Sequence, residues 1–309
     1  MIRVENLSKK IGETQILNSI NFQINDGEIL GFLGPNGAGK TTTMKIITGF
    51  WTPTSGNVFV NDKNVIENSL EIRGKLGYLP ETVPLYDEMK VYEYLKFIAE
   101  IRGIAPEKIK DSIKSVVNSC GLEKVIKKPI EELSKGYRQR VGLAQAIIHE
   151  PDIIVLDEPT TGLDPNQIIE IRNLIKEIGK NKTVIFSTHI LSEVQATCDR
   201  IIIIKDGIIV GQGTPSELAQ SAGGQEKIYV KIKGPQETVK RLLEEIKEIK
   251  EIIEKDREAE DILGYELLPQ DGMDIREILS VAVMQNNWSI LEFSKKSASM
   301  EDVFRELTK

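Results

Sequence analysis

The chain has 309 residues, and at about 100–200 residues per domain this length indicates one large domain with a smaller second one. Hydrophobic residues make up 40% and charged residues 28%, which excludes a disordered, collagen-like or disulfide-scaffold protein. The net charge of −7 disfavours a nucleic-acid partner, because contacts to a phosphate backbone need a basic surface.

Two features of the sequence predict a cytoplasmic protein. The two cysteines are too few for a disulfide framework and are typical of a reducing compartment. The longest apolar runs are far shorter than the ~20 residues that a membrane-spanning helix needs, and the first residues, MIRVENLSKKIG, lack the apolar core of a signal peptide. Any membrane role is therefore expected to depend on a partner.

The first two hundred residues alternate short apolar segments with segments of helical periodicity. The pattern predicts strands at 27–33, 58–60, 153–156 and 183–187, and helices at 44–47, 90–102, 106–119 and 167–178. Alternating strands and helices predict an α/β fold with a parallel sheet. Residues 78–133 are mostly helical and are interpreted as an insertion.

The C-terminal part differs in composition and is predicted to be a separate α+β domain. Residues 219–225 are small and polar and indicate a linker. After it we expect a strand at 228–232, a helix with an apolar stripe, a strand at 262–268, a helix at 275–284, a strand at 289–293 and a last helix at 300–307. The stripe comprises Leu242, Leu243, Ile246 and Ile249. The predicted domains are 1–218 and 226–309, and the second resembles a small split βαβ module.

A glycine-rich loop joins the first expected strand to the first expected helix. Glycines let the backbone curl so that successive N–H groups face one phosphate, and the helix N-terminus adds a partial positive charge. The terminal lysine can reach the β- and γ-phosphates, and the following hydroxyl can bind Mg²⁺. The predicted nucleotide-binding residues are Gly34, Pro35, Asn36, Gly37, Ala38, Gly39, Lys40, Thr41 and Thr42.

Two acidic residues, Asp157 and Glu158, follow the expected strand at 153–156. Taken alone, they are as well explained as exposed acids at a strand end. Beside a phosphate-binding loop, Asp157 is predicted to hold Mg²⁺ with Thr41, and Glu158 to act as the general base on an attacking water. Two adjacent carboxylates with different roles indicate hydrolysis rather than binding alone.

Further motifs complete a resemblance to a known family. The segment LSKGYRQR at 133–140 resembles the LSGGQ signature of ABC ATPases, and TGLD at 161–164 and STH at 187–189 are similar to that family's D-loop and switch-histidine motif. The resemblance covers residues 1–213. It implies a P-loop NTPase cassette with a mixed sheet and a helical subdomain at about 82–133, in which two chains enclose two ATP molecules. It also implies nucleotide contacts by Ser134, Gly136 and Asp164, and catalytic roles for Lys40 and His189.

The sequence departs from the family pattern at several positions. Ile11 stands where the family has an aromatic residue that stacks on adenine, so we expect an apolar base contact and relaxed discrimination between ATP and GTP. Glu81 replaces the usual glutamine of the Q-loop, and we expect it to bind Mg²⁺ with an added charge. Lys135 replaces one signature glycine, and Tyr137 replaces the signature glutamine.

The two histidines receive different interpretations. The resemblance implies that His189 binds the γ-phosphate and aligns Glu158 with the attacking water. His149 ends the signature helix before Pro151, where a cationic side chain would suit the helix dipole. We therefore expect His149 to be structural.

Residues 81–133 resemble the helical subdomain that contacts membrane-spanning partners. The C-terminal segment at 300–308 and the segments GYLPE at 77–81 and LSKGYRQRVGLAQA at 133–146 are similar to ATPase subunits of ABC-2 type exporters, including the gliding-motility-associated branch. This predicts an ATPase at the inner face of the membrane that drives export through a separate integral permease, paired with itself or a paralogue. The alternatives are a soluble ABC ATPase of translation or DNA maintenance and a non-catalytic ATP switch. A single cassette with acidic charge disfavours the soluble class, and intact Glu158 and His189 disfavour the switch.

Overall fold

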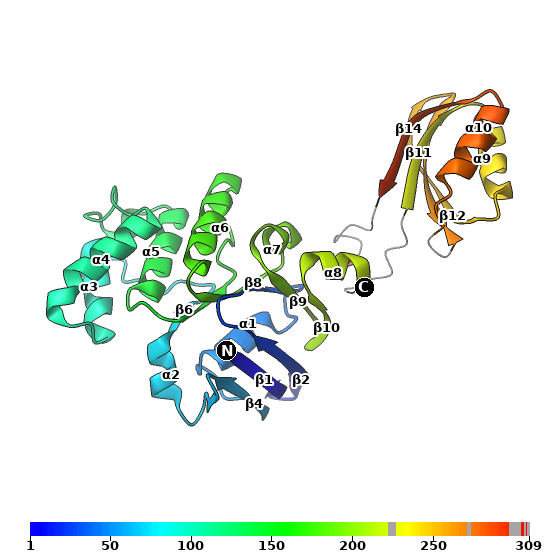
Figure 1. Cartoon of the computed structure of the whole chain (residues 1–309). Helices are drawn as coiled ribbons and strands as arrows, with labels where there is room; N and C mark the ends of the chain where they lie inside the picture. The colour runs from blue at the N-terminus through cyan, green and yellow to red at the C-terminus, as the bar shows by residue number, and fades with distance from the viewer. Residues whose placement is uncertain (222–226, 271–272, 297–303, 306, 308–309) are drawn as a thin grey trace. The chain divides into compact units, whose positions relative to one another are not determined.

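The computed structural model describes residues 1–221, 227–270, 273–296, 304–305 and 307, and it comprises two compact units (Figure 1). The division falls between Pro215 and Ser216. Part of the expected linker at 219–225 is helical, because α8 spans Pro215–Ser221, and residues 222–226 lie outside the described residues. Most of the last helix expected at 300–307 also lies outside them.

The first unit contains a six-stranded sheet that positions the candidate site. Its strands, in spatial order, are β10 (Ile208–Gly213), β9 (Arg200–Lys205), β3 (Ile29–Leu33), β8 (Thr183–Thr188), β7 (Ile153–Asp157) and β6 (Leu76–Leu79). All are parallel except β10. All residues of β3, β7 and β8 are buried, as expected for parallel strands covered on both faces. The carboxyl ends of these three neighbouring strands therefore meet at one edge.

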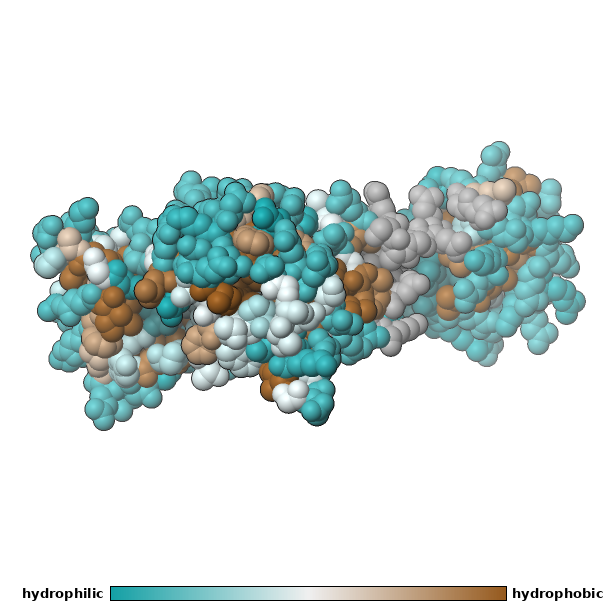
Figure 2. All heavy atoms as spheres, turned by 90° about the horizontal axis from the view of Figure 1, so that it is seen from below, coloured by the Kyte–Doolittle hydropathy of each residue, from teal (hydrophilic) through white to brown (hydrophobic). Residues whose placement is uncertain are grey.

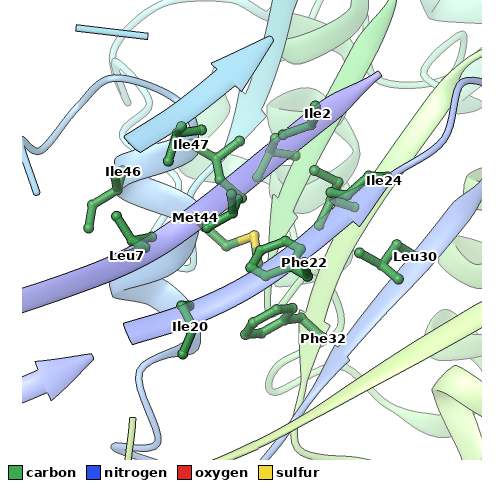
Figure 3. Close-up of a cluster of buried hydrophobic side chains, with 14 of the residues drawn as sticks. Ile2, Leu7, Ile20, Phe22, Ile24, Leu30, Phe32, Met44, Ile46 and Ile47 are labelled. Atoms are coloured by element: carbon green, nitrogen blue, oxygen red, sulfur yellow. The ribbon is translucent and has the colours of Figure 1, made fainter. Parts of the chain in front are cut away.

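The same unit has a second, antiparallel sheet, of which only the strand at 58–60, part of β4, was predicted from the sequence. It contains β2 (Thr14–Ile24), β1 (Ile2–Ile11), β4 (Ser55–Val60) and β5 (Lys63–Asn64) in that order. Its apolar face packs with the parallel sheet and with α1 (Lys40–Ile47) in one core, where Phe22, Phe32 and Met44 meet (Figure 3). Together the two sheets confirm the α/β fold with a mixed sheet core.

The two helices predicted within the insertion at 78–133 are present. The segment contains α3 (Val91–Ile101), α4 (Pro106–Cys120) and the short 3₁₀ helix Ile130–Glu132; α2 (Ser69–Lys75) precedes it and α5 (Lys135–Ile147) follows it. Pro106 occupies the first turn of α4, where its missing N–H costs nothing. On α3 the buried residues Val91, Tyr94, Leu95 and Ala99 share one face. The remaining helices of this unit are α6 (Pro165–Gly179) and α7 (Leu191–Thr197).

The second unit has the strand–helix order of a split βαβ module. Its elements are β11 (Lys227–Lys233), α9 (Gln236–Glu245), β12 (Ile249–Ala259), β13 (Ile262–Pro269), α10 (Arg276–Gln285) and β14 (Ser289–Lys296). They form an antiparallel sheet of order β12-β13-β11-β14. Strand β12 was missed and Ile249 was assigned to the preceding helix. The reason is that β12 is a highly charged edge strand with little apolar alternation.

The exposed surface is mixed in character. Figure 2 shows mainly hydrophilic atoms on the face seen from below, with hydrophobic atoms in small groups. Within the described residues, no helix combines the length and apolar character that crossing a membrane requires.

Candidate nucleotide-binding and catalytic site

The glycine-rich loop connects β3 to α1, and the side chain of Lys40 folds back against the backbone of this loop. Gly37 and Gly39 have φ values of 82° and 106°, which side-chain-bearing residues rarely adopt, and the chain curls there before α1 begins at Lys40. The buried Lys40 ammonium donates hydrogen bonds to the carbonyl oxygens of Gly34 (2.8 Å) and Pro35 (3.2 Å). A cation is thus held at the centre of the loop, as phosphate binding requires.

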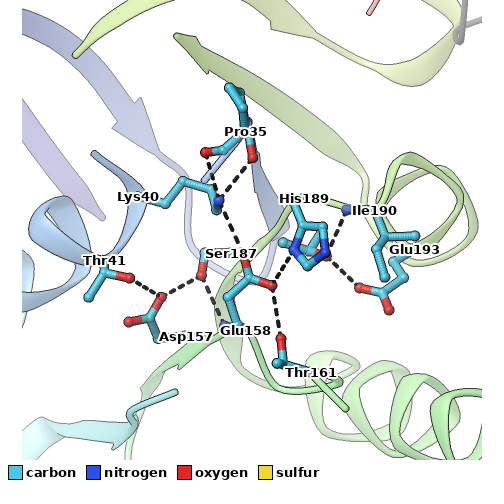
Figure 4. Close-up of polar contacts among 12 residues, drawn as sticks. Pro35, Lys40, Thr41, Asp157, Glu158, Thr161, Ser187, His189, Ile190 and Glu193 are labelled. Carbon is cyan, nitrogen blue, oxygen red and sulfur yellow. Dashed lines mark hydrogen bonds and ion pairs between the residues drawn. The ribbon is translucent and has the colours of Figure 1, made fainter. Parts of the chain in front are cut away.

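Glu158 lies at the centre of the polar network in Figure 4. Its Oε1 is 3.1 Å from Lys40 Nζ, and its Oε2 is 2.9 Å from His189 Nδ1. Oε2 also accepts a hydrogen bond from the Thr161 hydroxyl (3.2 Å). The backbone of Glu158 is left-handed, with φ of 49°, a conformation that costs free energy in a residue other than glycine and is common at active sites. The structure therefore brings the predicted base, switch histidine and P-loop lysine together.

Asp157 is fully buried at the end of β7 and has one free carboxylate oxygen. Its Oδ1 accepts hydrogen bonds from Ser187 Oγ (2.6 Å) and Thr41 Oγ1 (3.1 Å). Its Oδ2 is buried and has no hydrogen-bond partner within the described residues. Burial is the main cause that raises the pKa of this carboxyl, and the charges of Glu81 and Glu158 add to it. An unpaired carboxylate oxygen beside a hydroxyl is a donor set that fits Mg²⁺.

The segment that follows β8 and carries His189 is fixed by an acidic residue whose role was not predicted from the sequence. Glu193, in the first turn of α7, is only 1% exposed, and its Oε2 accepts a hydrogen bond from the Thr188 hydroxyl (2.6 Å). The same hydroxyl accepts a hydrogen bond from the Ile190 N–H (3.1 Å). These contacts hold the residues on both sides of His189. The sequence signal was an acid four positions after the switch histidine.

A cavity of about 390 Å³ lies over the P-loop. Glu81, the P-loop and Glu158 all line this cavity, although they are far apart in the sequence. Ile11 does not line the cavity and is 48% exposed at the end of β1, whereas Ile16 of β2 lines it. The lining residues are Ile16, Asn36, Gly37, Gly39, Lys40, Thr41, Thr42, Glu81 and Glu158.

The signature and D-loop residues lie outside this cavity. Ser134 caps α5, where its Oγ accepts a hydrogen bond from the Tyr137 N–H (3.5 Å), and Asp164 caps α6 by accepting one from the Gln167 N–H (2.9 Å). Both caps are exposed. Gly136 is buried against α6, since a Cβ there would lie 2.8 Å from Gln167 Cδ. These predicted nucleotide contacts are therefore separate from the Lys40 cavity within one chain.

The expectation of a cationic His149 is wrong. Burial and the charge of Arg102 lower its pKa to about 4, so the imidazole is neutral at physiological pH. Its Nε2 lies 3.1 Å from the Leu76 carbonyl oxygen, which links α5 to β6.

Comparison with known proteins is decisive for the family. A model of the ABC transporter family matches residues 17–161. The uncharacterized ABC transporter ATP-binding protein YxlF of Bacillus subtilis is 32% identical, and the match covers 98% of each chain. The chain belongs to the ABC transporter ATP-binding protein family. The bacitracin transport ATP-binding protein BcrA of Enterococcus faecalis is 40% identical over 71% of this chain and 70% of its own.

Solved structures agree with this assignment. An ATP-binding cassette described as a dimer in a post-hydrolysis state with ADP and Pi matches with a TM-score of 0.64 and 27% identity, over 69% of this chain and 98% of that chain. CbiO1 of Clostridium perfringens matches with a TM-score of 0.66 and 28% identity, over 79% and 95%. The protein is thus an ATP-binding and ATP-hydrolysing ABC subunit.

Proposed function

We propose that this chain powers export through a separate membrane permease, by closing as a pair of chains around two Mg·ATP and reopening after hydrolysis. The observation that supports it most is the network in which Lys40, Glu158 and His189 meet at one cavity (Figure 4). Relatives named for bacitracin transport and for lantibiotic transport support compounds of this kind as the exported class.

The ion pair between Lys40 and Glu158 suggests how substrate entry readies the base. Both side chains are almost fully buried, so each needs a partner of opposite charge. An incoming γ-phosphate would attract Lys40 away from Glu158. The freed carboxylate could then accept a proton from the attacking water while His189, 2.9 Å away, keeps it in place.

Three residues are proposed to hold Mg²⁺. Asp157 supplies the free buried oxygen, Thr41 a hydroxyl 3.1 Å from the other oxygen of the same carboxylate, and Glu81 a carboxylate in the lining of the cavity. When bound, Mg²⁺ neutralises charge on the phosphates. Within the described residues no group of three or more His, Cys, Asp or Glu side chains could hold a metal ion, so the proposed site has two carboxylates and one hydroxyl and leaves its other positions to phosphate and water.

The second half of each site is proposed to come from a second chain, either a copy or a paralogue. Ser134 and Asp164 are exposed, and neither lines the Lys40 cavity of its own chain. One chain alone therefore leaves a triphosphate open to water, and closure by the partner's signature would exclude it. Only a difference in ATP affinity between the open and closed pair can drive the permease.

Co-purification from membranes tests the transport proposal. A tagged Glu158→Gln chain, trapped with Mg·ATP, is expected to bring down one integral membrane protein, and a Lys40→Ala chain under the same conditions serves as the control. Vesicles containing both subunits should then show ATPase activity that rises with the transported compound. A chain that hydrolyses ATP but co-purifies with ribosomes or DNA instead would refute export and support the soluble class.

A further inference from the structure

Lys135, in the signature segment, differs in its surroundings from Lys40, the lysine that lines the cavity. It is the first residue of α5, directly after Ser134, and its side chain is exposed. Within the described part of the chain, no acidic group lies within ion-pair distance of its ammonium, and no hydrogen bond is made to it. Lys40, in contrast, is buried against Glu158. Lys135 is thus a charge at the signature surface that has no partner among the residues that the structure describes.

The Lys135 side chain lies along the D-loop rather than extending into solvent. A Cβ on Gly162 would be 2.0 Å from Lys135 Nζ and 3.1 Å from its Cε, so the ammonium rests on the bare Cα of this glycine. Gly162 has a φ of 71° and precedes the α6 cap Asp164 by two positions. A second close approach, between Gly136 and Gln167, joins the starts of α5 and α6. The signature loop and the D-loop are therefore one packed unit that carries the Lys135 charge.

We infer that Lys135 binds the γ-phosphate of the ATP held by the partner chain and stabilises its negative charge during cleavage. The inference rests on the proposed pairing of two chains. Lys135 does not line the cavity of its own chain, where Lys40 already supplies a cation. In the proposed pair, Ser134 of one chain faces the P-loop of the other, which would bring the adjacent lysine to the phosphate end of the nucleotide. A cation placed where charge develops is a major source of rate enhancement in phosphoryl transfer.

The test is turnover of the full-length chain and of defined mixtures. Lys135→Gln should lower kcat at least about tenfold. Its affinity for ATP as an unpaired chain should be unchanged, because Lys135 is outside the chain's own cavity. Lys135→Arg should recover most of the activity, since the charge is retained. Lys180→Gln, which removes an exposed lysine at the other end of α6, is the matched control and should behave as wild type.

Mixing variants distinguishes action across the pair from a structural role. In a mixed pair of Lys135→Gln and Lys40→Ala chains, one site carries both lesions and the other is intact if Lys135 acts on the partner's nucleotide. The mixture should therefore be more active than either parent. Mixing Lys40→Ala with Glu158→Gln chains should give no such gain, because those two residues act within one chain.

Two results would overturn the inference. The first is wild-type turnover by Lys135→Gln. The second is a loss in Lys135→Gln that mixing with Lys40→Ala does not relieve, which would make Lys135 a residue of its own chain's fold or site. A wild-type chain that neither pairs nor hydrolyses ATP would instead refute the proposed function itself.

Discussion

The cavity around Lys40 and the surface around Ser134 are organised in opposite ways. In the cavity, Lys40, Asp157 and Glu158 are buried and connected through hydrogen bonds and an ion pair (Figure 4). At the surface, Ser134 and Asp164 are exposed, and each makes a hydrogen bond within its own helix turn. The difference indicates that one chain pre-organises the phosphate-binding and base residues around Lys40. In the proposed pair, the Ser134 surface, which lies outside this cavity, completes the site of the partner chain.

The largest expected effect comes from removing the central cation of the cavity. Lys40→Ala should abolish measurable ATP turnover and also destabilise the fold, because it leaves the buried Glu158 carboxylate without its cationic partner. Breaking a buried ion pair from one side typically costs about 3–5 kcal/mol. The measurements are ATPase rate and chemical denaturation.

The double variant Lys40→Ala/Glu158→Ala is the matched control for that prediction. It should regain much of the lost stability without regaining turnover. A Lys40→Ala chain as stable as wild type would show that the Lys40–Glu158 ion pair does not stabilise the fold.

Asp157→Asn should separate catalysis from stability. Turnover should fall to near background, because the free oxygen proposed for Mg²⁺ is lost. The pKa of Asp157 is raised by burial, so its ionised form is disfavoured in the folded chain. The nucleotide-free variant should therefore be more stable than wild type at neutral pH, and the difference should shrink as falling pH protonates Asp157.

Thermal melts of the wild-type and Asp157→Asn chains across a pH series test whether the variant is the more stable of the two at neutral pH. A variant that is less stable at neutral pH would contradict the assignment of Oδ2 as an uncompensated buried atom.

Glu193→Gln should have an intermediate effect. It weakens the hydrogen bond that fixes Thr188 and the loop around His189, so kcat should fall about tenfold while ATP binding is retained. Glu177→Gln, an exposed acid on α6, is the control. Equal losses in kcat and ATP affinity would indicate general disruption rather than misplacement of the switch.

The smallest effect concerns His149, away from both halves of the site. Its pKa is about 4 in the folded chain against an ordinary value of 6.5, so below pH 6.5 the unfolded chain binds a proton that the folded chain does not. Its contribution to stability is present above pH 6.5 and lost as pH falls towards 4. His149→Gln should make the unfolding free energy less dependent on pH in this window without affecting ATPase activity at neutral pH.

An unchanged pH dependence in His149→Gln would contradict a neutral buried imidazole.

Much of the cavity could be predicted from sequence because its chemistry depends on local spacing. The loop from Gly34 to Thr41 and the pair Asp157–Glu158 each follow a strand, and parallel strand ends meet at one edge. Glu193 was missed because its role depends on burial, which a lone acid on a short helix does not reveal.

The helices and strands also divide into those that local sequence predicts and those that it does not. The helices α3 and α4 were predicted to within one residue at each end, because apolar periodicity indicates α3 and Pro106 marks the start of α4. The strands β1 and β2 were not predicted, and β12 was taken as helix in part, because twist, bulges and edge charges hide their alternation. Where charge and burial conflict, as in His149, position on a helix was a poor guide to ionisation.

The central claim is that Mg·ATP joins two chains through the exposed Ser134 surface of one and the Lys40 cavity of the other. Light scattering of the purified Glu158→Gln chain measures this directly, because the variant should bind ATP without cleaving it. The predicted result is the mass of a single chain without nucleotide and twice that mass with Mg·ATP, with no change for Glu158→Gln/Lys40→Ala. A Glu158→Gln chain that binds Mg·ATP yet keeps the mass of one chain at every protein concentration would contradict the account.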